Sequence, residues 1–381
     1  MRWSLLTAIS VSPALLFSFA GFGAAQAPDG IRVSAPVTHE NLTVYFIHGR
    51  SAPGKVPLTL DEAMAKRVVQ VRETGNVNEL EIENLGDDEV FIQSGDIVKG
   101  GRQDRALVVS LVLPPRSGRV PIASFCVEEG RWTARGREDA GRFASAAQGV
   151  PSREMKLAMK APKPVPPAGD PLRSNPSAIA PETLDALRGL PPSSQRSNPN
   201  AAAATETAAR QREMWEGARS TRARLSGALG ADVSSRQSAS SLQLALENEK
   251  LIEVQRAYIK AFAAVGEAES DIIGYVFAVN GKLNSADVYP SNGLFRKMWA
   301  KLLAASATEA IGHKDEPRVE APPIEAVMAF LAAAERGTES NKPLNDGVSL
   351  VTRESEQAYL FETARPASPS SSWVHRNYLA K

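Results

Sequence analysis

The composition of the chain changes sharply at residues 161–209, a stretch dense in Pro, Ser, Ala and Asn. Such a stretch buries too little apolar surface to offset the entropy lost on ordering. We interpret it as a flexible insertion, with one helical turn expected near 182–187. It separates a region with strand signals from a region with helix signals, so the fold must join two unlike regions around it.

The region before the insertion is predicted to consist mostly of β-strands. The stretches NLTVYFI (41–47), NELEIEN (78–84), VFIQ (90–93), ALVVSLVL (106–113) and RVPIASFCV (119–127) each predict a strand, because they are rich in β-branched residues or alternate apolar and polar residues. The fourth is apolar on both faces, so we expect a single central strand there. One short helix is expected in LTLDEAMAKR, capped by Thr59 or Asp61.

The region after the insertion alternates helices with strands. Apolar residues at spacings of three and four predict a helix over 245–265. The dipeptide Asn280-Gly281 predicts a type I′ hairpin, and Ser291 or Asn292 is expected to cap the following helix. A further helix is expected at 324–335, and strand-like runs at 358–363 and 373–379.

These patterns predict an α+β protein. We expect residues 28–160 to form a β-rich lobe, a sandwich or a distorted barrel, that packs with a C-terminal helix and hairpin lobe of residues 210–381. The two lobes are expected to form one composite domain. With 381 residues and 43% apolar side chains, the chain is long enough for a sizeable core.

The N-terminal residues predict export. Arg2 precedes an apolar stretch that ends in small residues, the pattern of a secretory signal, and cleavage is expected after Ala25 or Ala27. The expected location is therefore periplasmic or secreted, with no membrane contact after cleavage. The alternative is an uncleaved N-terminal membrane anchor.

The single cysteine, Cys126, excludes an internal disulfide. Cys126 has no histidine near it in sequence and is followed by Glu128 and Glu129, which oppose thiolate formation. We therefore expect a buried structural thiol beside a charged turn. The formal charge of +1 gives no reason to expect a nucleic-acid partner, and the common metal and hydrolase motifs are absent from the sequence, so no metal or other cofactor is expected.

Two charged turns are the candidate sites. In SGDIVKGGRQDR (94–105), paired glycines precede Arg102, Gln103 and Arg105, which allows a tight turn suited to holding an anion. In CVEEGRW (126–132), Glu128, Arg131 and Trp132 follow the expected strand end. The alternative for both is a tight connection whose arginines pair with nearby carboxylates.

These two stretches, together with GYVFAVNGKLNSADVYPSNGLFRKMWAKLLAASATEA (274–310), resemble the ARG and rhodanese-phosphatase-superfamily-associated protein domain, a domain of unknown function. The matching positions span roughly residues 38–380. Glu129 stands where a glutamine is usual, and the insertion is longer than usual. The matching residues are Gly95, Asp96, Gly100, Gln103, Arg105, Cys126, Glu128, Gly130, Arg131, Trp132, Asn280, Gly281, Asp287, Phe295, Trp299, Lys301 and Leu302.

The resemblance implies a link to nucleotide or ADP-ribose metabolism but no catalytic mechanism. Two functional hypotheses stay open. The first is a non-enzymatic exported protein that binds a small anionic ligand or an envelope protein through the two turns. The second is an enzyme acting on a phosphate- or ribose-bearing small molecule, with Glu128 or Asp287 as the acid/base and Arg105 as an anion clamp. The oligomeric state is not predicted.

Overall fold

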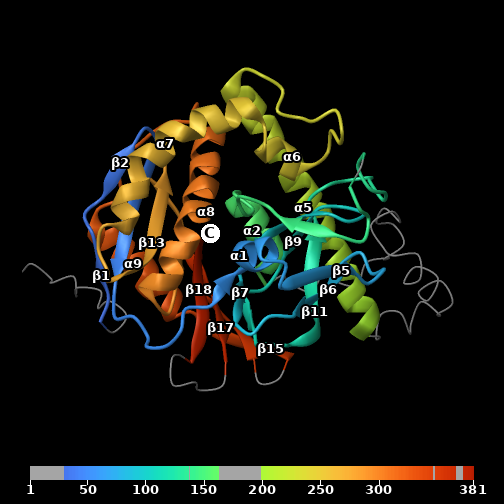
Figure 1. Cartoon of the computed structure of the whole chain (residues 1–381). Coiled ribbons are helices and arrows are strands. Elements are labelled where there is room, and N and C mark those ends of the chain that lie inside the picture. Colours follow the sequence, from blue (N-terminus) through green and yellow to red (C-terminus); the bar gives the residue numbers. More distant parts are fainter. Residues whose placement is uncertain (1–29, 137, 163–198, 346–347, 366–371) are drawn as a thin grey trace, which may run out of the picture.

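The computed structural model describes residues 30–136, 138–162, 199–345, 348–365 and 372–381 (Figure 1). The expected signal sequence and the expected helical turn at 182–187 lie outside these residues. Among the residues described, no helix is both long and apolar enough to cross a membrane.

A nine-stranded antiparallel sheet forms the centre of the fold and confirms the expected hairpin. The N-terminal strand β3 pairs with β13, and β13 turns into β14 through Asn280 and Gly281, which have φ angles of +52° and +77°. Both central turn residues thus adopt the left-handed conformation of a type I′ turn. The path through the sheet is β1 (Arg32–Val33), β3 (Leu42–His48), β13 (Ile272–Val279), β14 (Lys282–Val288), β18 (Trp373–Ala380), β17 (Ala358–Ala364), β16 (Val348–Glu354) and β15 (Thr338–Asn345), with β2 (Val37–His39) also pairing with β3.

Helices cover both faces of this sheet, because successive strand residues point to opposite faces. On one face Phe46 and Phe277 pack in a core with α7 (Glu249–Glu267) and α8 (Asn292–Gly312). On the other face Tyr45 and Val276 pack against α9 (Ile324–Glu335). Ser291 caps α8 by accepting a hydrogen bond from the backbone N–H of Leu294.

The N-terminal region forms a second, smaller β unit with its own core. A six-stranded sheet that is nearly a closed barrel lies beside a three-stranded sheet. Helix α1 (Leu60–Ala65) begins at Thr59, which forms a capping box with Glu62, so Thr59 rather than Asp61 is the cap. The strands are β12 (Phe143–Ser145), β8 (Ile97–Gly100), β9 (Arg105–Leu107), β11 (Gly118–Cys126), β6 (Glu79–Asn84) and β5 (Val69–Glu73) in the first sheet, and β10 (Leu111–Leu113), β7 (Val90–Ile92) and β4 (Leu58–Thr59) in the second.

Three further helices join the two β units. The long helix α5 (Pro199–Leu229) contacts α8, β11 and α2 (Arg153–Lys160), and α6 (Leu242–Leu246) packs on α5 (Figure 1). Helix α5 begins inside the stretch that the sequence assigns to the insertion. Residues 199–209 are therefore helical.

The α+β class is confirmed, but one expected strand is wrong. Residues 106–113 divide into β9 and β10, which belong to different sheets. Ser110 lies at the division, where its Oγ accepts a hydrogen bond from the backbone N–H of Ser94 at 2.9 Å. At Ser110 the chain passes from the six-stranded sheet to the three-stranded sheet. The apolar residues on both faces of this stretch do not reveal that change.

Candidate functional site

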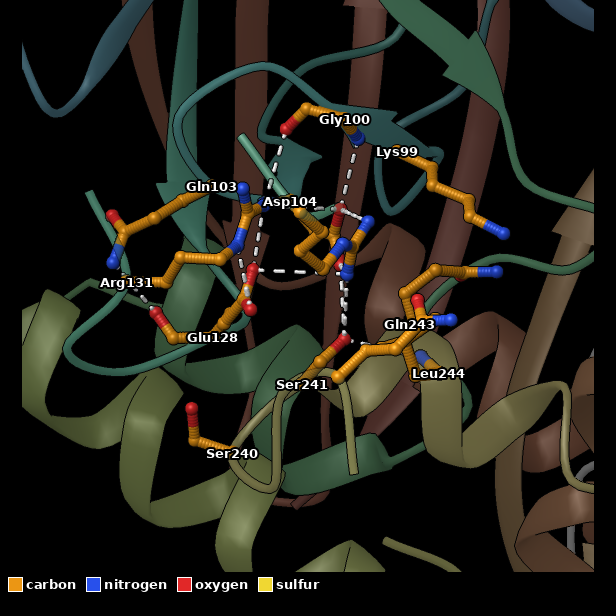
Figure 2. A network of polar contacts seen from close by, with 12 residues as sticks. Lys99, Gly100, Gln103, Asp104, Glu128, Arg131, Ser240, Ser241, Gln243 and Leu244 are labelled. Atoms are coloured by element: carbon orange, nitrogen blue, oxygen red, sulfur yellow. Dashed lines mark hydrogen bonds and ion pairs between the residues drawn. The ribbon is translucent and has the colours of Figure 1, made fainter. Parts of the chain in front are cut away.

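The two charged turns meet in space and form a buried network, which we call the clasp: Asp104, Glu128, Arg131, Arg135 and Ser241. Figure 2 shows Asp104 between Gly100 and Ser241, with Glu128 and Arg131 beside it. Asp104 follows β8 in the first turn, Glu128 and both arginines follow β11, and Ser241 caps α6. The clasp therefore ties the barrel to the helices.

Asp104 is the centre of the clasp. Its carboxylate accepts two hydrogen bonds of 2.7 Å from the guanidinium of Arg135, one on each oxygen. Ser241 Oγ and the backbone N–H of Gly100 each donate to it at 2.9 Å. Burial alone would lower the pKa of Arg135, but Asp104 and Glu138 outweigh it and raise that pKa above its ordinary value. The Asp104 carboxylate and the Arg135 guanidinium are thus almost fully hydrogen-bonded inside the clasp.

Glu128 is equally enclosed. Arg131 Nε donates to its Oε1 at 2.7 Å, and the backbone N–H of Asp104 donates to its Oε2 at 3.3 Å. Arg131 also donates to the carbonyl oxygens of Gly101 and Thr133. Glu128 is 0% exposed, so neither oxygen is open to a ligand in this state.

The remaining predicted residues lie at the outer edge of the clasp. Gln103 Nε2 donates to the carbonyl oxygen of Glu128 at 3.1 Å. The guanidinium groups of Arg102 and Arg105 each lie 5.6 Å from the ring centre of Trp132, which is 41% exposed. Arg105 is itself fully buried, and its Nε and Nη2 donate no hydrogen bond within the part of the chain that the structure describes.

The strand end at Cys126 is fixed to α5. The side-chain amide of Gln211 accepts from the backbone N–H of Cys126 and donates to its carbonyl oxygen, both at 2.9 Å. Trp215 Nε1 donates to the carbonyl oxygen of Glu128 at 3.2 Å. Cys126 is fully buried, and burial raises the pKa of its thiol to about 11, so the expectation of a buried thiol is confirmed.

A second group of residues surrounds a cavity of about 30 Å³, which we call the polar cavity. This volume is about that of two water molecules or one carboxylate group. Five of its lining residues carry the family resemblance and come from separate segments of the sequence: Gly95, Asp96, Asp287, Lys301 and Leu302. Other lining residues are Gln93, Lys156, Tyr275 and Asn377.

One wall of the polar cavity is an ion-paired lysine. Lys301 Nζ, on α8, lies 2.8 Å from Asp96 and 2.9 Å from Asp61. Burial alone would lower the pKa of Lys301, but the two carboxylates outweigh it and raise that pKa above its ordinary value. The charge of Lys301 is therefore already balanced.

On the other side of the cavity, Asp287 of β14 contacts two residues of β18. Asp287 Oδ1 accepts from Asn377 Nδ2 at 2.8 Å, and His375 Nε2 makes a close but bent contact with it at 3.1 Å. Burial alone would raise the pKa of Asp287, but His375 and two nearby lysines lower it below the ordinary value. Asp287 is thus a carboxylate rather than a carboxylic acid at neutral pH.

Two lysines one turn apart on α2 face this carboxylate. Lys160 Nζ donates to Asn377 Oδ1 at 2.5 Å and lies 4.7 Å from the ring centre of Phe361. Burial lowers its pKa to about 7. Lys156 lines the cavity, and its ammonium has no hydrogen bond or ion pair to any residue that the structure describes.

The clasp and the polar cavity are joined by strand β8. Asp96 lies just before the strand, and Gly100, at its end, donates to Asp104. Four strand residues span about 13 Å. One motif, SGDIVKGGRQDR, therefore supplies both a cavity wall and the clasp.

A larger cavity, of about 560 Å³, lies on the other face of the main sheet beside α9. Leu331, Arg376 and Tyr378 are among its lining residues. None of the residues that carry the family resemblance lines it.

The sequence analysis correctly predicted that the two turns lie together, but it missed several residues that bond to them or line the polar cavity. Arg135 and Ser241 stand outside the motifs and bond to Asp104, and Lys156, His375 and Asn377 lie in segments with no motif. A buried aspartate needs charge-assisted donors, so the one available signal was Asp104 directly before the strand that begins at Arg105. Glu128 and Asp287, the two acid/base candidates, belong to separate networks.

The comparisons with known proteins give one match. A family model described as the ARG and Rhodanese-Phosphatase-superfamily-associated Protein domain matches residues 30–166 and 185–379. No curated protein and no solved structure matches the chain.

Proposed function

The chain belongs to the ARG and rhodanese-phosphatase-superfamily-associated protein domain family, and from this premise we propose that it is a non-enzymatic binding protein. The proposed ligand is a small organic molecule with one anionic group that enters the polar cavity. We also propose that the protein acts outside the cytoplasm, on the evidence of the export pattern in residues 1–27.

Lys156 carries this proposal. Lys301 is ion-paired with Asp96 and Asp61, and Asp287 accepts a hydrogen bond from Asn377 beside His375. Lys156 is the lining charge that has no hydrogen bond or ion pair among the described residues. It acts on Asp287 only over a longer distance, and it lies 5.9 Å from the ring centre of Phe277. A carboxylate or phosphate oxygen supplies the missing hydrogen-bond acceptor, and an ammonium that is not already hydrogen-bonded is suited to receive it.

The geometry supports binding over acid/base catalysis. Glu128 uses both oxygens inside the clasp. The lowered pKa of Asp287 leaves it ionised, so it has no proton to donate, and it is a weak base. Arg105 contacts Gln103 and Glu73, beside the clasp, rather than Asp287.

A second anion-binding position is favoured by one observation at the clasp. Two buried donor groups of Arg105, Nε and Nη2, make no hydrogen bond to any described residue, and the nearest carboxylate oxygen, Glu73 Oε2, lies 3.7 Å from Nη2. Buried donors of this kind normally have a partner. Arg102, which has no ion pair within the described structure, and the exposed Trp132 lie over this position. An anion that displaces the Trp132 ring would reach both guanidinium groups.

The test is a thermal-shift screen of the full chain against carboxylates, phosphates, nucleotides and ADP-ribose. Lys156→Met and Arg105→Met are measured in parallel with Lys260→Met, an exposed lysine on α7. A ligand that stabilises wild type and Lys260→Met, but not Lys156→Met, supports the polar cavity. If the ligand fails to stabilise Arg105→Met but still stabilises Lys156→Met, the result supports the position at the clasp instead. Stabilisation that survives both substitutions, or any turnover of a stabilising compound, contradicts the proposal.

A further inference from the structure

Two helices, α2 and α8, bring a histidine and two glutamates together on the α2 side of the main sheet. Glu154 lies in the first turn of α2, and Glu309 and His313 lie one turn apart near the end of α8. One ligand atom from each lies within 4.8 Å of the others. The sequence shows no metal motif here, because Glu154 is far from the other two along the chain.

Glu309 is a buried carboxylate without a full countercharge. It is 3% exposed, and its Oε1 accepts from the backbone N–H of Arg153 at 3.1 Å and from Asn284 Nδ2 at 3.3 Å, both neutral donors. The nearest ionisable nitrogen among the described residues is His313 Nε2 at 3.9 Å. A buried carboxylate in this setting is stabilised by a proton or by a cation.

His313 is oriented as a metal-binding histidine is. Its Nδ1 lies 2.5 Å from Glu316 Oε1, which places a proton on Nδ1 and leaves the Nε2 lone pair toward Glu309. Metal-ligating histidines usually make this bond from the ring nitrogen that does not hold the metal.

Asn284 supplies an independent observation. The residue is 7% exposed, and its Oδ1 has no hydrogen-bond partner within the part of the chain that the structure describes. Its Nδ2 donates to Glu309 Oε1 at 3.3 Å. Half a turn of the amide would exchange Nδ2 and Oδ1 and turn Oδ1 toward Glu309, as a metal ligand requires.

We propose that Glu154, Glu309, His313 and Asn284 form a binding site for a divalent transition-metal ion. One imidazole with carboxylate and amide oxygens suits Zn²⁺ or Mn²⁺ better than Ca²⁺, which takes oxygen ligands alone. Glu154 is 49% exposed and also lines a groove of about 520 Å³ beside α5, so the ion has a path from solvent. The site is separate from the polar cavity and does not depend on the proposed function.

Arg224 is the competing cation. Its Nη2 lies 3.5 Å from Glu154 Oε2, but Glu309 has no arginine side chain within 4 Å among the residues described. If Arg224 already neutralises the site, its removal destabilises the protein and does not improve metal binding. If the site holds a metal, Arg224→Met raises the metal affinity, because a like charge is removed.

The test is a titration of the tag-free full chain, treated with a chelator and dialysed, with ZnCl₂, MnCl₂ or CaCl₂ in a calorimeter. We expect one Zn²⁺ or Mn²⁺ per chain and weak or no Ca²⁺ binding. His313→Ala and Glu309→Gln should each lower the affinity at least tenfold, since each removes a ligand. Glu154 lies at the exposed edge of the site, so Glu154→Gln should also lower the metal affinity. This variant replaces the buried ones if they fail to fold.

Two further results decide the proposal. Glu309→Gln should raise the melting temperature of the chelated protein while losing the stabilisation by metal, which a purely structural carboxylate would not do. His48→Ala is the matched control. Among the described residues, His48, Glu269 and Asp271 form the other three-residue cluster, and both of its carboxylates already pair with Arg32. Absence of Zn²⁺ and Mn²⁺ binding, or binding that is lost in His48→Ala but kept in His313→Ala and Glu309→Gln, overturns the proposal.

Discussion

Arg135 and Asp104 meet through two parallel hydrogen bonds of 2.7 Å, with Arg135 at 1% and Asp104 at 0% side-chain exposure. Removal of one partner from such a pair leaves the other charge buried and alone. We expect Arg135→Ala to lower the free energy of unfolding by about 3–5 kcal/mol. Arg142 forms an exposed ion pair in which its own side chain is 86% exposed. Arg142→Ala should therefore change the free energy of unfolding by less than about 0.5 kcal/mol. Urea denaturation compares the two, and equal effects would falsify the role given to the clasp.

Lys301 stabilises the fold by neutralising Asp96 and Asp61. Its folded-state pKa is raised, so the stabilisation is present below the unfolded pKa of about 10.4 and is lost as pH rises through the folded pKa. We expect Lys301→Met to be strongly destabilised at pH 7, and Lys301→Met with Asp96→Asn to recover part of the loss. Denaturation of both variants from pH 7 to 11 checks this, and a double variant no more stable than the single one contradicts it.

Lys160 gives the opposite dependence on pH. Burial lowers its folded-state pKa to about 7, so between that value and about 10.4 the unfolded chain binds more protons than the folded chain. This contribution to stability therefore rises with pH from about 7 to 10. We expect Lys160→Met to be more stable than wild type at pH 6 and to have a flatter pH profile. Lys260→Met should follow the wild-type profile, and an identical profile for Lys160→Met would rule out the shifted lysine.

Cys126 should be inert in the folded protein. With the pKa of its thiol raised to about 11 by burial, on the order of one thiol in a thousand is ionised at pH 8, and solvent does not reach it. We expect a thiol-specific reagent to label Cys126 only as fast as the protein unfolds. Labelling in urea is the positive control. Rapid native labelling would show that the strand end opens.

Gly281 tests the hairpin at the centre of the sheet. Its φ is +77°, and an added Cβ would lie 2.5 Å from the carbonyl oxygens of Val319 and Glu320. We expect Gly281→Ala to cost about 1–3 kcal/mol. Gly227→Ala, in α5 with open space at its Cβ, should stabilise by about 0.5–1 kcal/mol. Thermal unfolding of the two variants should therefore shift in opposite directions.

Much of the local structure was predictable from the sequence. The helix at α7, the turn at Asn280, the caps at Thr59 and Ser291 and the burial of Cys126 all follow from patterns within a few residues. The strand over 106–113 failed because periodicity does not say which sheet a strand joins. For the site, the sequence analysis correctly predicted that the two turns lie together. It interpreted them as a ligand pocket, whereas in the structure most of their charged side chains bond to one another.

The sequence by itself determined the α+β class, the hairpin and the family, and it narrowed the starts of α1 and α8 to two candidate caps each, because these depend on turn chemistry and side-chain periodicity over short stretches. The helix expected over 245–265 instead divides into α6 and α7, with Asn248 as the cap of α7. Only the tertiary structure decided that β3 pairs with β13, that Arg135 binds Asp104, and that Asp96, Lys301 and Asp287 share one cavity with Lys156. The physical reason is that strand pairing and charge neutralisation require contact in space between residues far apart in the chain. Which buried charges neutralise one another is settled only when the strands and helices pack.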